Sequence, residues 1–189
     1  DGEILVRGPN VFQGYYKDPV ATKATLIDGW LYSGDVGAFD EDGFLRITDR
    51  KKDLIITAGG KNVAPQNLEK QLRAIDGIAQ AVVIGDRRKY LTALLTLCPD
   101  RAPRLAADNN WPQALEALAK DPAFKGHVER AIESNVNESL ARYEQIKRFT
   151  LLPRDFSEEE GELTPTQKLK RNVIVPKHAE IIEEMYPST

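Results

Sequence analysis

The sequence contains one cysteine, one methionine and no apolar run long enough to cross a membrane. Because only Cys98 carries a thiol among 189 residues, no disulfide can form within the chain, and a reducing, cytoplasmic setting is predicted. The longest hydrophobic stretches have the length of ordinary strands, so a transmembrane helix is not expected. The methionine is Met185, near the end, and the chain opens on DGEILVRG. We therefore expect a piece excised from a longer protein.

The chain also lacks an excess of basic residues. Its 26 lysines and arginines are outnumbered by 29 aspartates and glutamates, which gives a formal net charge of −3. Nucleic-acid-binding domains usually have the opposite balance, so no nucleic-acid partner is expected. The two histidines, His127 and His178, are isolated in the sequence, and neither a CxxC nor an HExxH motif occurs. No metal site is predicted.

Hydropathy patterns predict an α+β fold. A strand is expected at 3–7, followed by a hairpin whose arms, LYSGDVGAF and FLRIT, meet at Asp42-Gly43. The apolar runs AQAVVIG and LTALLTL predict two further strands, buried on at least one face. RFTLLP indicates one more short strand later in the chain.

Helices are predicted mainly in the second half of the chain. Pro65 is suited to the first helical position of PQNLEKQLRAI, which places Leu68, Leu72 and Ile75 on one face. From 100 to 112 the sequence is rich in proline, aspartate and asparagine, and helices are expected after it, near 113–119 and 121–141. A short closing helix is predicted to begin near Pro176.

The pattern changes at residues 49–53, where we place a domain boundary. Residues 1–51 contain hairpins and turns and are too few for a domain, so they are assigned to the tail of a preceding one. Residues 52–189 are predicted to form a small domain with a central, mostly antiparallel sheet flanked by helices.

Two residues before this boundary are candidates for binding a nucleotide. Asp35, beside Gly34, offers a carboxylate that can accept two hydrogen bonds, as from vicinal ribose hydroxyls, although the spacing in YSGDVG by itself favours a turn-capping role. Arg50 offers a rigid fork of donors suited to a phosphate. A surface salt bridge to Asp49 or Asp53 would explain it as well.

Three further features of the sequence are candidates for a hinge, a ligand-binding loop and a catalytic charge. Lys52 lies at an element boundary, where a hinge can absorb a large backbone rotation, although many such lysines are only solvated. Gly59 and Gly60 permit close approach of a ligand, and equally an ordinary hairpin turn. Lys168, in ELTPTQKLKRN, could deliver a positive charge to a carboxylate or phosphate, or could belong to a solvated basic patch.

The order of three motifs narrows these alternatives. GWLYSGDVG, DRKKDLIITAGGKNVAPQNLE and LTPTQKLKR together resemble the C-terminal part of the AMP-forming acyl-CoA synthetases, the adenylating (ANL) superfamily that includes luciferases and peptide-synthetase adenylation domains. LARYEQIKRF and GELTPTQKLKR resemble the long-chain fatty-acid–CoA ligase branch in particular. Other branches more often have a Gly-Lys pair where this chain has Gln167-Lys168.

The resemblance implies roles in the first half-reaction for three residues. Asp35 matches the acid that binds the ribose hydroxyls of ATP or AMP, and Arg50 matches the arginine that contacts the ribose and phosphate region. Lys168 matches the catalytic lysine that reaches the acyl carboxylate and the α-phosphate. Mg²⁺ would be bound mainly by the large N-terminal AMP-binding domain, of which residues 1–51 would be the tail.

For the second half-reaction, the resemblance implies a rotation. Lys52 matches the hinge about which the C-terminal domain turns. Gly59, Gly60 and Lys61 match the loop that then enters the active site and lines the tunnel for CoA.

The implied reaction joins a fatty acid to CoA with conversion of ATP to AMP and pyrophosphate, through an acyl-adenylate. The partners would be these small molecules and the enzyme's own N-terminal domain, with peripheral membrane association of the full enzyme as a further option. Since the phosphate loop and acyl pocket belong to that domain, the isolated chain is expected to be inactive. The alternatives are a ligase that passes its acyl group to a carrier protein, and a non-catalytic binding module.

Overall fold

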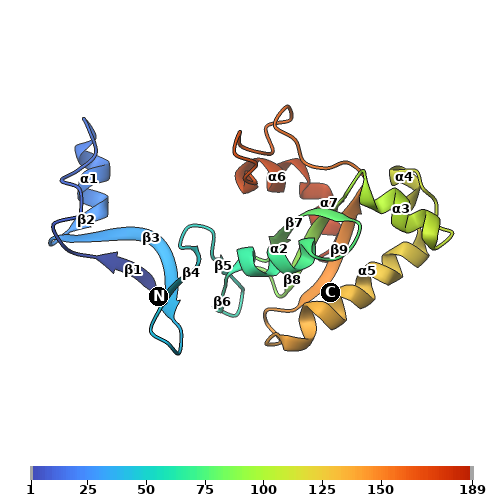
Figure 1. The fold of residues 1–189 in the computed structure, drawn as a ribbon, viewed down its shortest axis with the longest axis horizontal. Coiled ribbons are helices and arrows are strands. Elements are labelled where there is room, and N and C mark those ends of the chain that lie inside the picture. The colour runs from blue at the N-terminus through green and yellow to red at the C-terminus, as the bar shows by residue number, and fades with distance from the viewer. Residues whose placement is uncertain (1, 188–189) are drawn as a thin grey trace. The chain divides into compact units, whose positions relative to one another are not determined.

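The computed structural model describes residues 2–187, and the chain divides into two compact units, one ending at Leu54 and the other beginning at Ile55 (Figure 1). The first unit is built around one long strand, β3, with which three shorter strands pair in antiparallel fashion. Its elements are β1 (Glu3–Val6), α1 (Pro19–Thr25), β2 (Leu26–Ile27), β3 (Trp30–Phe39) and β4 (Leu45–Arg50).

The predicted hairpin of the first unit is confirmed. Strands β3 and β4 are its arms, and Gly43 in the turn has a φ of +83°, a conformation that glycine adopts without strain. Helix α1 is not predicted by the hydropathy pattern, because it buries no residue. It begins instead at a local cap, where the Asp18 carboxylate accepts a hydrogen bond from the Ala21 amide at 2.9 Å.

The second unit has a three-stranded sheet in the order β7-β8-β9. Strands β7 and β8 are antiparallel, whereas β8 and β9 are parallel. This is the one parallel pair among the strands of residues 2–187, so the predicted α+β fold with mostly antiparallel pairing is confirmed. The unit's strands are β5 (Ile55–Ile56), β6 (Asn62–Val63), β7 (Ile78–Ile84), β8 (Leu91–Leu97) and β9 (Ile146–Leu152).

Helices cover both faces of this sheet. On one face, α2 to α5 pack against residues such as Val83 and Leu95. On the other face, α6 and α7 pack with the 156–163 loop against Val82 and Leu94. The central strand β8 is buried along its whole length, which explains the nearly continuous apolar run LTALLTL. The helices are α2 (Pro65–Arg73), α3 (Arg101–Asp108), α4 (Leu115–Leu118), α5 (Pro122–Asn135), the 3₁₀ turn η1 (Asn137–Ser139), α6 (Arg171–Lys177) and α7 (Ala179–Glu184).

Helix α2 begins at Pro65 as predicted, and Leu68 and Leu72 on its apolar face are each at most 3% exposed. Ile75, predicted on the same face, lies two residues beyond the end of α2 and is buried as well. The expected helix over 121–141 is wrong in its end, because α5 stops at Asn135. The cause is tertiary. The buried Asn137 side chain bonds both backbone groups of Ile146, accepting from N–H at 2.9 Å and donating to C=O at 3.0 Å.

Two more boundaries differ from the prediction. Helix α3 occupies Arg101–Asp108, inside the 100–112 stretch, whereas the sequence predicts helices only after that stretch. The closing segment holds two helices where one was predicted to begin near Pro176. Helix α6 begins at Arg171, whose guanidinium donates to the Val83 carbonyl at 2.8 Å, and α7 begins at Ala179. Pro176 lies inside α6, one residue before its end, and cannot donate a backbone hydrogen bond to the residue four positions earlier.

Candidate functional site

The two predicted nucleotide-binding residues lie together in the first unit. Asp35 on β3 is directly opposite Arg50 on β4, and the Arg50 Nε lies 2.7 Å from the Asp35 Oδ1. The ion pair is partly open to solvent, with the Asp35 side chain 24% exposed and that of Arg50 60% exposed. Arg50 therefore makes a salt bridge to Asp35 on the neighbouring strand.

A second ion pair, between Lys51 and Glu3, involves the residue that follows Arg50. The Lys51 Nζ lies 2.8 Å from the Glu3 Oε2, and the Gly34 amide donates to the Glu3 Oε1 at 3.0 Å. The hydrogen bond from Lys51 holds the pKa of Glu3 below its usual value. Glu3 thus ties β1 to the residue before Asp35. Nothing in the residue pattern near Glu3 predicts this role, because the contact joins residues 48 positions apart.

Lys52, the predicted hinge, is exposed in a turn that follows β4. The turn is closed by the Asp53 and Leu54 amides, which donate to the Arg50 carbonyl at 2.9 and 3.2 Å. The division between the two compact units falls immediately after Leu54. Lys52 therefore lies on the last turn of the first unit, in the short segment that leads into the second.

Gly59 and Gly60 form the tip of the β5–β6 hairpin in the second unit. The Gly60 amide donates to the Thr57 carbonyl at 2.8 Å, and Gly60 has a φ of +72°. A side chain added at Gly60 would meet no atom within 4 Å, so the surface here is open. Lys61, the next residue, places its Nζ 5.8 Å from the centroid of the Tyr143 ring.

Lys168 lies on a separate loop of the second unit, between β9 and α6, and is exposed. The root of this loop is closed by a β-bridge between Leu163 and Leu169, and both leucines pack in the core on the α6–α7 face. Lys168 is therefore exposed to solvent on a loop whose two ends are held together by core leucines.

Beneath this loop lies a buried carboxylate that the sequence patterns do not single out. The Glu162 side chain is fully buried, and both of its oxygens accept hydrogen bonds from the Arg154 Nη2, at 2.9 and 3.0 Å. The Ser157 amide donates to it at 3.1 Å, and the Lys177 Nζ lies 3.0 Å away. Its backbone carbonyl accepts from the Lys170 amide at 2.8 Å, so Glu162 joins the end of β9, the loop and α6.

Burial and pairing act on the pKa values of this cluster. Burial by itself would raise the pKa of Glu162, but the hydrogen bonds from Lys177, the Ser157 amide and Arg154 together lower it. Burial lowers the pKa of His178, whose Nε2 lies 3.8 Å from the Glu162 Oε1. Near neutral pH the cluster therefore holds an ionised Glu162 and a neutral His178.

These shifts predict loss of stability in acid. The pKa of His178 is lower when folded than its ordinary value of 6.5, so the unfolded chain takes up a proton first and the free energy of unfolding falls as pH drops below about 6.5. A second loss follows below the ordinary glutamate pKa of 4.5, because the pKa of Glu162 is also lowered. Urea unfolding at several pH values measures both.

The matched variant is His178→Gln, which should show no loss of stability from the first step. The free energy of unfolding of the wild-type chain should therefore fall relative to that of His178→Gln between pH 7 and pH 5. Parallel pH profiles for the two chains would contradict the assignment to His178.

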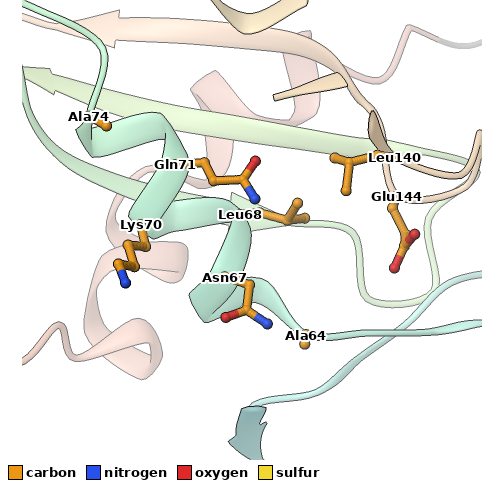
Figure 2. Close-up of a pocket in the computed structure, with 8 residues that line it drawn as sticks. All are labelled: Ala64, Asn67, Leu68, Lys70, Gln71, Ala74, Leu140 and Glu144. Carbon is orange, nitrogen blue, oxygen red and sulfur yellow. The ribbon is translucent and has the colours of Figure 1, made fainter. Parts of the chain in front are cut away.

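One pocket, of about 530 Å³, lies along α2 (Figure 2). Figure 2 shows the Gln71 and Leu68 side chains on the helix, with Leu140 and Glu144 across from them. None of the predicted site residues lines this pocket. Within residues 2–187, no group of three or more His, Cys, Asp or Glu side chains could hold a metal ion, and no helix is long and apolar enough to span a membrane.

Comparison with known sequences identifies relatives of the whole chain. Long-chain-fatty-acid–CoA ligase FadD15 of Mycobacterium tuberculosis is 46% identical over 98% of this chain. The human long-chain-fatty-acid–CoA ligase ACSBG1 is 39% identical, also over 98%. The chain spans only 31% and 28% of the lengths of these two proteins, a little under a third.

Solved structures agree with this relationship. The adenylation domain of the carboxylate reductase from Mycobacterium chelonae matches 98% of this chain with a TM-score of 0.78 and 28% identity, over 27% of its own length. The o-succinylbenzoate–CoA synthetase MenE of Bacillus subtilis, in complex with AMP, matches 90% with a TM-score of 0.61 and 30% identity, over 29% of its length. The family described as AMP-binding enzyme C-terminal domain matches residues 52–189, and the chain belongs to this family.

Proposed function

We propose that this chain is the C-terminal part of a long-chain fatty-acid–CoA ligase. The full enzyme would work in the cytoplasm on a fatty acid, ATP and CoA. In the first step a carboxylate oxygen attacks the α-phosphorus of ATP, and pyrophosphate leaves. In the second step the thiol of CoA attacks the acyl carbon, loses its proton, and AMP leaves.

The observation that carries this proposal is the 46% identity with FadD15 of Mycobacterium tuberculosis over nearly the whole chain. Seven further relatives have names that include fatty-acid–CoA ligase, at 36% to 46% identity. The non-catalytic binding module is disfavoured, because the residues that the resemblance assigns to nucleotide binding, hinge and catalysis are all present.

The Asp35–Arg50 pair would bind the nucleotide. Its carboxylate can accept hydrogen bonds from both ribose hydroxyls, because a carboxylate has free lone pairs beyond the one that faces Arg50. Arg50 fixes the orientation of that carboxylate, and its 60% exposed side chain leaves other guanidinium donors for a phosphate. Residues 1–51 would be the tail of the AMP-binding domain.

Lys168 would act in the first step. An exposed ammonium on a loop with a buried root can approach the α-phosphate and the attacking carboxylate, where negative charge grows in the transition state. Mg²⁺ would be held mainly by the N-terminal AMP-binding domain, because the described residues form no group of three or more His, Cys, Asp or Glu side chains that could bind it.

Residues 52–189 would be the mobile domain, and Lys52 its hinge. Rotation about Lys52 would remove Lys168 after adenylation and bring Gly59, Gly60 and Lys61 to the acyl-adenylate. The open surface beside Gly60 is suited to the close approach of the narrow thiol-bearing arm of CoA.

A different acyl acceptor is the second candidate. The TM-scores with the adenylation domain and the A-PCP didomain of carboxylic acid reductase, 0.78 and 0.75, exceed the 0.61 found with the CoA synthetase MenE. Because one of these neighbours is an adenylation domain joined to a PCP domain, an adenylating ligase that passes its acyl group to a carrier protein is the second candidate. Release of AMP from the purified acyl-adenylate complex on addition of CoA alone distinguishes the two.

The test of the proposal is ATP–pyrophosphate exchange by the full-length parent across a series of fatty acids. We expect exchange that depends on a long-chain fatty acid, followed by acyl-CoA formation when CoA is added. The isolated 189-residue chain should show neither. No exchange by the parent with any fatty acid, or acyl-CoA formation by the isolated chain, would overturn it.

A further inference from the structure

The two lysine-bearing loops of the second unit have the same backbone construction. In TAGGK, the Thr57 amide donates to the Lys61 carbonyl at 3.0 Å, and the Lys61 amide donates to the Thr57 hydroxyl at 3.2 Å. In TPTQK, the Thr164 amide donates to the Lys168 carbonyl at 2.8 Å, and the Lys168 amide donates to the Thr164 hydroxyl at 3.0 Å. A threonine thus holds the backbone of a lysine four residues later in both.

The residue before each lysine is in the left-handed conformation. Gly60 has a φ of +72° and Gln167 a φ of +60°, and the amide of each donates to the carbonyl of its threonine at 2.8 Å. Glycine adopts this conformation without steric conflict, whereas a residue with a Cβ does so at a cost. Gln167 therefore occupies a position for which glycine is the unstrained choice.

The Gln167 side chain has a specific partner. Its Nε2 donates to the Oε1 of Glu158, nine residues earlier. Glu158 lies in a turn that is itself held, because its carbonyl accepts from the Gly161 amide at 2.9 Å and the neighbouring Ser157 amide donates to buried Glu162. The contact therefore links the tip of the Lys168 loop to a turn with a buried anchor.

We infer that Gln167 is a positioning residue for Lys168, which it holds through its hydrogen bond to Glu158. A glycine at position 167 would have no side chain to hold this turn, whereas Gln167 attaches the turn to Glu158 one residue before the lysine. The ammonium of Lys168 is then presented from a loop held at its root by the leucine bridge and at its tip by Glu158. This inference rests on the proposed role of Lys168 in adenylation.

The test uses Gln167→Gly, Glu158→Ala and the double variant in the full-length parent. Gln167→Gly keeps the left-handed turn but loses the attachment, and Glu158→Ala removes its other end. Each should slow acyl-adenylate formation about tenfold, because a displaced catalytic group loses alignment. CoA-dependent release of AMP from preformed acyl-adenylate should stay at the wild-type rate, and the double variant should be no slower than either single one.

Two controls accompany these variants. Glu158→Gln keeps a carbonyl oxygen at the same reach and should restore most of the adenylation rate. Glu159→Ala removes the neighbouring exposed carboxylate and should leave both half-reactions unchanged. Adenylation at the wild-type rate in Gln167→Gly and Glu158→Ala, equal slowing of both half-reactions, or additive effects in the double variant would each overturn the inference.

Comparison with Lys168→Ala distinguishes failure of the positioning role of Gln167 from failure of the proposed role of Lys168 in adenylation. If Lys168→Ala abolishes adenylation while Gln167→Gly and Glu158→Ala retain it, only the positioning role fails. If Lys168→Ala itself adenylates at the wild-type rate, the proposed role of the lysine fails, and the positioning role fails with it.

Discussion

Replacing Lys168 with alanine in the full-length parent is expected to slow acyl-adenylate formation by about 10²- to 10³-fold, the loss typical of removing one electrostatic stabiliser of a transition state. The reason is that Lys168 would be the positive charge that meets the negative charge growing on the α-phosphate. Pre-steady-state formation of acyl-AMP, or ATP–pyrophosphate exchange, measures the effect.

The second half-reaction is the internal control for this prediction. Lys168 would be withdrawn before the CoA thiol attacks, so Lys168→Ala should release AMP from supplied acyl-adenylate at the wild-type rate. The matched variant is Lys170→Ala, which removes the same charge two residues later and should adenylate normally. A Lys168→Ala enzyme that adenylates normally, or one that loses both half-reactions equally, would refute the assignment.

Lys52→Pro is expected to impair thioester formation at least about tenfold more than adenylation. Proline fixes φ near −65° and also restricts the residue before it, so the turn at 51–54 could no longer rotate between two states. The amides that close this turn on the Arg50 carbonyl are those of Asp53 and Leu54, so the substitution removes neither bond, and adenylation, which precedes the rotation, should be less affected.

Lys52→Ala is the matched control, since it removes the same side chain and leaves the backbone free. It should support both half-reactions at nearly the wild-type rate. Separate assays of acyl-AMP formation and of CoA-dependent AMP release are required for both variants. Equal loss of the two activities in Lys52→Pro would show that position 52 is structural and not a pivot.

The local elements followed directly from residue type and spacing. The Asp42-Gly43 turn, the helix starting at Pro65 and the buried strand LTALLTL are all where the sequence places them. Each depends on neighbours within a few residues, such as a glycine at positive φ or a proline in the first turn. The membership of the chain in an adenylating family is also visible in the order of its motifs, and the comparisons confirm it.

The misplaced boundaries have a common physical reason. Helix α5 ends at Asn135 because Asn137 bonds to Ile146, and α6 begins at Arg171, whose side chain reaches Val83. Both contacts join residues that are distant along the chain or lie on different elements. Helical periodicity continues past such a point in the sequence, so periodicity by itself cannot locate it.

The sequence by itself determined which residues are candidates: Asp35, Arg50, Lys52, the glycine pair and Lys168. Only the tertiary structure decided how their surroundings hold them. It paired Asp35 with Arg50 across two strands, and it buried Glu162 beneath the Lys168 loop. It also placed Gln167 in the left-handed backbone conformation that favours glycine, and gave its side chain a hydrogen-bond partner in Glu158. Cross-strand register, burial and φ are set by contacts that fold the chain back on itself, and no single motif contains them.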